Sequence, residues 1–275
     1  MTVLSTMSGD RREDTFTSRG SVGWTAPLWQ TIRGLFGLVV LLGLWWLGTS
    51  ILPAEGSFAR QFSPAVAIPK LAELLTGSDL PTHILVSLKR VFVGLGLALL
   101  IGVPTGLAVG TSSLLNQATS PAFQFLRMIS PLSWMPLAVM VFGVGDPPIY
   151  FLLAFAAVWP ILLNTAEAVR KLDPSWIRLS QSLAATRFET LWHVVVPGVL
   201  GHILTGLRLA IGIVWIVLVP CEMLGVSAGL GYFILDTRDR LAYSELMAIV
   251  LLIGFLGFLL DLFARTIYRL ATPGS

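Results

Sequence analysis

The stretch VFVGLGLALLIGVPTGLAVG, residues Val91–Gly110, carries no charged side chain over its whole length. A bilayer core of roughly 30 Å needs about 20 helical residues at 1.5 Å per residue, so this stretch predicts a membrane-spanning helix. The composition agrees, because 55% of the 275 residues are hydrophobic and only 12% are charged. Soluble domains carry about 25% charged residues. The composition therefore excludes a soluble enzyme and a nucleic-acid-binding module.

Five further apolar stretches flank this one, and together they predict an all-α integral membrane protein with six transmembrane helices. The runs are continuous rather than alternating apolar and polar, which favours helices over the strands of a barrel. Pro131 and Pro136 interrupt the third span, and Pro160 lies inside the fourth. The five additional spans are Gly34–Leu52, Ala122–Val144, Pro148–Ala168, Gly198–Met223 and Leu246–Tyr268.

The chain divides into a polar N-terminal tail, residues 1–30, and a six-helix domain, residues 31–270. The tail has no apolar run of the kind found in a signal peptide, and Trp24–Arg33 predicts a short interfacial helix. Lys and Arg residues collect in the tail, in the 169–196 loop and near the C-terminus. Cytoplasmic loops are enriched in these residues, so we expect both termini to be cytoplasmic.

Two loops are long enough to form structure of their own. In residues 53–89, the amphipathic stretch Ala65–Leu75 predicts a helix lying on the outer membrane surface. Its expected apolar face consists of Val66, Ile68, Leu71, Leu74 and Leu75. Residues 169–196 predict a cytoplasmic helix–turn–helix, with Asp173 as the N-cap and Pro174 at the first helical position. This loop carries apolar side chains far from the bilayer core, which indicates a protein partner. The apolar residues are Trp176, Ile177, Leu179, Leu183, Phe188, Leu191 and Trp192.

Small and charged residues inside the spans are informative about packing and function. Gly102, Gly106 and Gly110 form a groove for a close helix, which we expect within one bundle rather than at a dimer seam. Arg208 lies near mid-membrane and either attracts an anion, pairs with a carboxylate during gating or makes a fixed interhelical contact. Arg127 has the same alternatives. Glu222 is expected near the outer end of its helix, as a cap or gate residue.

The prolines of the third span free backbone groups that lipid cannot satisfy, which is tolerated where the backbone is buried or lines a water-filled cavity. The third span is thus the best candidate for pore lining, with a kinked packing helix as the alternative. The expected translocation-path residues are Arg127, Ser130, Ser133, Trp134, Arg208, Trp215 and Glu222.

No catalytic, metal or cofactor site is expected in the chain itself. The single cysteine, Cys221, excludes a disulfide framework, and the three histidines are far apart in sequence. The sequence has no GxxxxGK[ST] loop for a nucleotide phosphate. If transport uses ATP, another chain must bind it.

The segment RLSQSLAATRFETLWHVVVPG, Arg178–Gly198, resembles the cytoplasmic coupling loop of ABC importer permeases. Relative to that pattern, Arg178 replaces a Glu and Ala184 replaces a Gly. Because Ala is also small, we expect the second replacement to do little harm. The segments Phe125–Asp146, Val158–Thr165 and Thr205–Trp215 are similar to the nitrate/sulfonate/taurine/bicarbonate permease subfamily. The resemblance covers about residues 35–270, including the outer segment Ser63–Leu75.

The resemblance implies a type I ABC importer permease in a bacterial inner membrane, working as the pathway-forming subunit rather than as an enzyme. It implies a second permease copy, two ATPase chains that bind ATP and Mg²⁺, and a periplasmic or lipid-tethered binding protein. The helix from about Ile177 to Trp192 would dock in a cleft on the ATPase. Its expected contact residues are Ile177, Ser180, Leu183, Ala184, Ala185, Thr186, Arg187 and Phe188.

The leading hypothesis is import of a small anion of the nitrate, bicarbonate, sulfonate or taurine class. The alternatives are the same machine carrying a neutral or cationic heterocycle such as a vitamin precursor, a stand-alone secondary transporter, a membrane-embedded enzyme and a scaffold. An enzyme would need clustered polar groups at one depth, and a secondary transporter would show inverted repeats and ion-coupling acids. The sequence shows neither pattern.

Overall fold

A computed structural model describes residues 36–37, 39–54, 57–77 and 79–271. The polar tail with its expected interfacial helix, and the start of the first predicted span, lie outside these residues. Within the described part of the chain every regular element is helical. Four helices are long and apolar enough to cross a membrane: α3 (Leu80–Thr111), α6 (Asp146–Lys171), the continuous helix Arg187–Glu222 and α11 (Tyr243–Ala271). Four of the six predicted spans are therefore confirmed.

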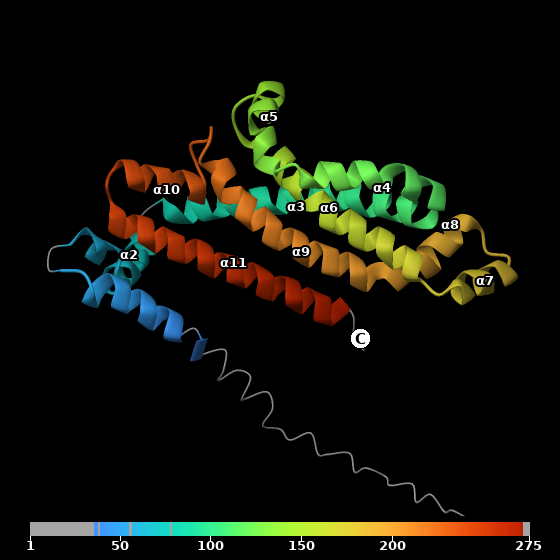
Figure 1. Cartoon of the computed structure of the whole chain (residues 1–275), viewed down its shortest axis with the longest axis horizontal. Coiled ribbons are helices and arrows are strands. Elements are labelled where there is room, and N and C mark those ends of the chain that lie inside the picture. The colour runs from blue at the N-terminus through green and yellow to red at the C-terminus, as the bar shows by residue number, and fades with distance from the viewer. Residues whose placement is uncertain (1–35, 38, 55–56, 78, 272–275) are drawn as a thin grey trace, which may run out of the picture.

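The third predicted span is strongly bent instead of continuous. Its first part, α4 (Ser113–Met128), is followed by a 3-10 turn at Pro131–Trp134 and then by α5 (Met135–Phe142). The two parts are inclined at 86° to each other, and α5 projects away from the long helices (Figure 1). Ile129 and Ser130 are extended, as expected for residues before a proline. The helix also begins at Ser113, earlier than the predicted Ala122.

The first predicted span is described only in part. Its helix Val39–Ile51 is shorter than a full bilayer crossing and ends in a π-helical turn, Leu47–Ile51. A short 3-10 turn, Phe58–Phe62, and α2 (Pro64–Gly77) follow it. The six-helix count is thus supported for four spans and a bent pair.

The long helices form one elongated bundle in which α6 is the central element. It packs against α3 on one side and against α9 (Val196–Glu222) on the other, and α11 lies along α9 (Figure 1). At one end of the bundle lie α2 and α10 (Leu230–Asp239), and at the opposite end lie α7 (Pro174–Ser182) and α8 (Arg187–Thr190). The two long loops of the sequence therefore occupy opposite ends, as expected for a membrane protein.

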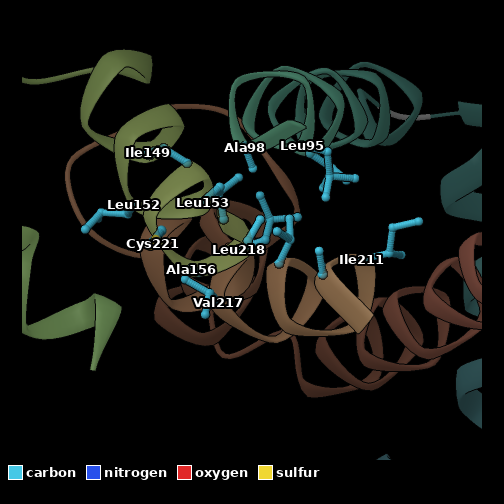
Figure 2. Packing of buried hydrophobic residues seen from close by; sticks show 14 of the residues in the cluster. Leu95, Ala98, Ile149, Leu152, Leu153, Ala156, Ile211, Val217, Leu218 and Cys221 are labelled. Carbon is cyan, nitrogen blue, oxygen red and sulfur yellow. The ribbon is translucent and has the colours of Figure 1, made fainter. Parts of the chain in front are cut away.

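The core is made mainly of aliphatic side chains from α3, α6 and α9, with smaller contributions from α5 and α11. Leu95 and Ala98 of α3 approach the α6 residues, and Leu218 of α9 lies among them (Figure 2). Burial of apolar area between helices gives little stabilisation in lipid, so close packing must hold the bundle together. The further labelled members of this core are Ile149, Leu152, Leu153, Ala156, Ile211, Val217 and Cys221.

The glycines of α3 provide that close packing. A Cβ atom on Gly106 would lie 2.7 Å from the Leu162 carbonyl oxygen and from the Thr165 Cβ, and one on Gly110 would lie 2.6 Å from the Val169 Cβ. The neighbour is α6 of the same chain. The expectation that this groove packs within one bundle is confirmed.

The outer amphipathic segment is also a helix, but its buried face differs from the predicted one. Ala67 and Leu74 of α2 are buried, whereas Val66, Ile68 and Leu75 are exposed. Leu71 joins Leu74 against α3, α10 and α11. Tertiary contacts with these helices, rather than a membrane surface, cover this face.

Candidate functional site

The loop between α6 and α9 forms the predicted helix–turn–helix at one end of the bundle. The Asp173 side chain accepts a hydrogen bond from the Ser175 backbone N–H, which confirms it as the N-cap of α7. That bond lowers the pKa of the Asp173 carboxyl below its ordinary value. Thr186 and Glu189 cap each other's backbone N–H groups at the start of α8, in a capping box.

The turn between the two helices is made at Ala184, whose φ is +59°. This left-handed conformation is uncommon for residues other than glycine. We expected Ala to replace the Gly of the coupling-loop pattern without harm because it is small. The structure shows that the relevant property of Gly at this position is its conformational freedom, in addition to its size.

The turn exposes large apolar side chains beyond the end of the bundle. Leu183 is 75% exposed and Phe188 is 70% exposed, and Ala184, Thr186 and Arg187 are exposed beside them. The other three predicted contact residues, Ile177, Ser180 and Ala185, are half-buried or buried on the inner side. Ile177 and Ala185 line a cavity of about 630 Å³ toward the α3–α4 turn. The exposed apolar surface additionally includes Trp176, Leu179 and Trp192, whose amphipathic spacing was visible in the sequence.

Helix α8 does not end before the fifth span. It continues through a π-helical turn, Leu191–Val195, into α9, so that one helix runs from Arg187 to Glu222. The predicted start at Gly198 was therefore too late. The helix that leaves the turn is thus the same helix that runs through the bundle.

Arg208 makes an ion pair with Asp261 of α11 inside the span region. The Arg208 Nε lies 3.1 Å from Asp261 Oδ1, and Arg265 Nε lies 2.7 Å from Asp261 Oδ2. The three side chains are about 40–50% exposed. An interhelical contact for Arg208 was one expected alternative, but Asp261 was not identified from the sequence.

The other predicted path residues lie in different surroundings. Arg127 is exposed on α4 and forms no ion pair with any residue in the described ranges. Ser130 and Ser133 are exposed at the bend, while Trp134 packs on Phe155 of α6. Trp215 donates a hydrogen bond to the Ile253 carbonyl and is half-buried against α11. The structure does not bring these residues together with Arg208.

Glu222 is the path residue whose surroundings differ most from expectation. It is 0% exposed, and its carboxylate accepts hydrogen bonds from the Arg90 Nη1, the Ser87 hydroxyl and the Gly231 backbone N–H. A solute cannot reach this carboxylate in the present conformation. Glu222 therefore joins helices within the bundle instead of lining a pathway here.

Arg90 is the centre of this buried cluster and was missed by the sequence analysis. It donates to Glu222 at 2.7 Å and to Asp146 at 2.6 Å, and its Nη1 also reaches the Ala228 carbonyl. The second span was predicted to begin at Val91, which would leave Arg90 at a helix end. Because α3 begins eleven residues earlier, at Leu80, Arg90 lies inside the helix and inside the protein.

The helical bundle, the projecting bent span and the exposed apolar turn at one end define a permease subunit of an ABC importer. The chain belongs to the family described as the binding-protein-dependent transport system inner membrane component, whose model matches residues 98–274. It is a permease subunit, not an enzyme.

Curated relatives support the same conclusion. The chain is 38% identical to the bicarbonate transport system permease protein CmpB of Synechocystis over 193 residues, covering 70% of this chain and 69% of that protein. It is 32% identical to the taurine transport system permease protein TauC of Escherichia coli, covering 91% and 92%. It is 31% identical to the nitrate import permease protein NrtB of Synechocystis, covering 90% and 91%.

Solved structures share the fold. A chain of the MetNI methionine ABC transporter in an inward-facing conformation superimposes with a TM-score of 0.60 at 18% identity, covering 70% of this chain and 96% of that one. A chain of a bacterial ABC transporter for the acidic polysaccharide alginate gives a TM-score of 0.52 at 16% identity, covering 88% and 98%. At this identity the likeness concerns the fold alone.

Proposed function

We propose that this chain and a second permease copy form the translocation pathway for a small oxyanion, such as nitrate, bicarbonate or the sulfonate of taurine. An external binding protein delivers the solute, and two ATPase chains bind ATP and Mg²⁺. The relatives named for bicarbonate, taurine and nitrate support this substrate class. Arg208, a cation inside the α9 span, is consistent with an anion.

The main structural support for binding of an ATPase is the exposed apolar turn between α7 and α8. Leu183, Phe188 and Trp192 form an exposed apolar surface outside the bundle. Apolar surfaces of this kind mark sites that a protein partner covers. The segment from Ile177 to Trp192, which forms the end of α7, the turn at Ala184 and the start of the next helix instead of the single expected helix, would fill a cleft on the ATPase. The ATPase would then move α9 directly, because α8 and α9 are one helix.

The α7–α8 end of the bundle then lies in the cytoplasm, and the α2–α10 end faces the binding protein. Helix α11 runs from the α10 end toward the α7 end of the bundle (Figure 1), which supports a cytoplasmic C-terminus. The basic residues of the 169–196 loop support this orientation. The bent third span, with Ser130, Ser133 and Trp134, would line the pathway.

The substitution Ala184→Asp tests the coupling assignment, with Ala184→Asn as its matched control. Asn and Asp both adopt the left-handed conformation that Ala184 requires, so the two variants differ mainly in charge. We expect Asp to weaken co-purification of the ATPase and to uncouple uptake, and Asn to retain both. Normal ATPase binding and uptake in the Asp variant would contradict the assignment.

A further inference from the structure

The ion pair between Arg208 and Asp261 lies within two membrane-spanning helices, far from their ends. At 1.5 Å per residue, Arg208 lies about 18 Å from Val196 and about 21 Å from Glu222 along the helix. Asp261 lies about 15 Å from the end of α11 at Ala271. Both positions are inside helices that are apolar enough to span a bilayer.

The side-chain exposure of the pair indicates what the surrounding face of the bundle contacts. The side chains of Arg208 and Asp261 are 42% and 39% exposed within the chain, and that of Arg265 is 51% exposed. Charged groups in contact with lipid hydrocarbon are strongly unfavourable, so intramembrane charges face a protein interior or a water-filled cavity. The α9–α11 face that carries these three residues must therefore meet water or another protein surface.

The three charges do not cancel. Two guanidinium groups share one carboxylate, which leaves a net charge of +1 when all three are ionised. Asp261 uses one oxygen for each arginine, and Arg208 contributes only its Nε. Within the described residues the Nη groups of Arg208 have no hydrogen-bond partner, and those N–H groups form the fork that binds planar oxyanions.

A cavity lies directly beside Arg208. Its volume is about 190 Å³, and α3, α9 and α11 all contribute to its wall. Among the described residues of that wall Arg208 alone is charged, and the others are apolar or glycine. Gly96 of α3 lines it, and a Cβ atom there would meet nothing within 4 Å. The low polarity of such a wall strengthens the attraction between a guanidinium and an anion.

We propose that Arg208 is an oxyanion subsite of the translocation path and that Asp261 is its displaceable counter-ion. Asp261, held also by Arg265, keeps Arg208 in place when the subsite is empty. An arriving oxyanion binds the Nη edge of Arg208 and weakens the Arg208–Asp261 contact. Because Asp261 competes with the anion for Arg208, it determines the affinity of the subsite and so contributes to its specificity among anions. This inference rests on the proposed function, and it adds Asp261 and Arg265 to the site.

The first experiment measures the local potential without measuring transport. In the assembled transporter in phosphatidylcholine vesicles, Leu204→Cys, in the cavity wall, is treated with membrane-impermeant thiol reagents of opposite charge. We expect the anionic reagent to react about tenfold faster relative to the cationic one, as about 1.4 kcal/mol of attraction would give. Nitrate should slow that reaction. Arg208→Gln should remove the preference, and Asp261→Asn should increase it.

Two controls accompany this measurement. The first control is Ile216→Cys, because Ile216 lies on the same helix as Leu204 and is 75% exposed. If exposure within the chain alone set the rate, this cysteine would react faster than the one at position 204. We expect this face of α9 to contact lipid, so the cysteine should react with neither reagent. The unmodified chain, whose one cysteine is the buried Cys221, gives the blank. If Leu204→Cys reacts with neither reagent, lipid or a protein surface covers this face and the inference is overturned. Equal rates, or a preference that appears only with anionic phospholipid, also overturn it.

The second experiment separates a solute-binding role from a structural one. The double variant Arg208→Gln with Asp261→Asn replaces the ion pair by a neutral hydrogen-bonding pair of similar shape. We expect nitrate, bicarbonate and taurine uptake to fall at least about tenfold while binding-protein-stimulated ATP hydrolysis persists. Arg269→Gln, which removes an exposed charge of the same helix α11 outside the proposed subsite, should leave both unchanged. Wild-type uptake in the double variant would show a merely structural pair. If the unmodified complex shows no stimulated hydrolysis, the proposed function fails, and the thiol rates still decide the subsite.

Discussion

Arg90 of α3 and Glu222 of α9 form a fully buried ion pair, with 2.7 Å between Nη1 and Oε1, although they are 132 positions apart in the sequence. Their side chains are 3% and 0% exposed. Asp146, the first residue of α6, binds the same guanidinium. One arginine therefore joins α3, α6 and α9 at the α10 end of the bundle, and we expect these helices to move as one unit during transport.

Glu222→Gln should destabilise the protein severely. It leaves the buried Arg90 without one of its two carboxylates, and breaking a buried pair costs about 3–5 kcal/mol. The measurement is the thermal unfolding midpoint of the purified permease complex in detergent. Glu167→Gln, which removes an exposed pair with Lys171, is the control and should change the midpoint little. Equal midpoints for the two variants would contradict the structural role of Glu222.

Gly229→Ala should destabilise the protein by displacing the Arg90–Glu222 ion pair. Gly229 has φ +124°, and a Cβ atom there would lie 2.5 Å from both the Arg90 Nη1 and the Glu222 carboxylate. A strained backbone position alone costs about 1–3 kcal/mol, and displacement of the ion pair adds to that. Gly212→Ala is the matched control, because a Cβ there meets nothing within 4 Å. A thermal midpoint that falls only for the Gly229 variant is the expected result.

Gly106→Ala should separate α3 from α6. The added methyl group would lie 2.7 Å from the Leu162 carbonyl oxygen and the Thr165 Cβ, and overpacking of this kind costs about 1–3 kcal/mol. On the same helix, Gly96→Ala enters open space and should be tolerated. The comparison is the fraction of each variant that stays monodisperse after a heat step. Similar losses for both variants would show that the α3–α6 contact is looser than described.

Ala184→Gly should stabilise the α7–α8 turn. Ala184 has φ +59°, and a left-handed residue other than glycine is less favourable by about 1 kcal/mol. Ala184→Val, with a β-branched side chain, should have the opposite effect. Protease cleavage within residues 174–192 should become slower in the Gly variant and faster in the Val variant. The reverse order would mean that the turn adopts another backbone conformation.

Sequence patterns predicted the spans well where apolar runs were long and unbroken. Val91–Gly110, Pro148–Ala168 and Leu246–Tyr268 all lie within observed helices, but each helix is longer than its apolar run. Hydropathy marks the part of a helix that lies in lipid, not its extension into water. That is why Arg90 was assigned to a helix end and its role was missed.

The coupling turn was also predictable, because capping and amphipathic spacing are local properties. Asp173 and Pro174 mark the start of α7, and Leu183 and Phe188 were expected to be free for a partner. The left-handed conformation of Ala184 has no local signal in an alanine. The resemblance to a pattern with Gly at this position indicated a small residue, not this conformation.

The sequence by itself determined the membrane class, four of the spans, the helix–turn–helix of residues 169–196 and the transport family. These properties depend on composition and on residues close together in the chain. Tertiary structure alone decided the pairing of Arg90 with Glu222 and of Arg208 with Asp261, and the 86° bend of the third span. Charges inside a bilayer must find partners, but which partner each one finds depends on how distant helices pack, and no local pattern records that.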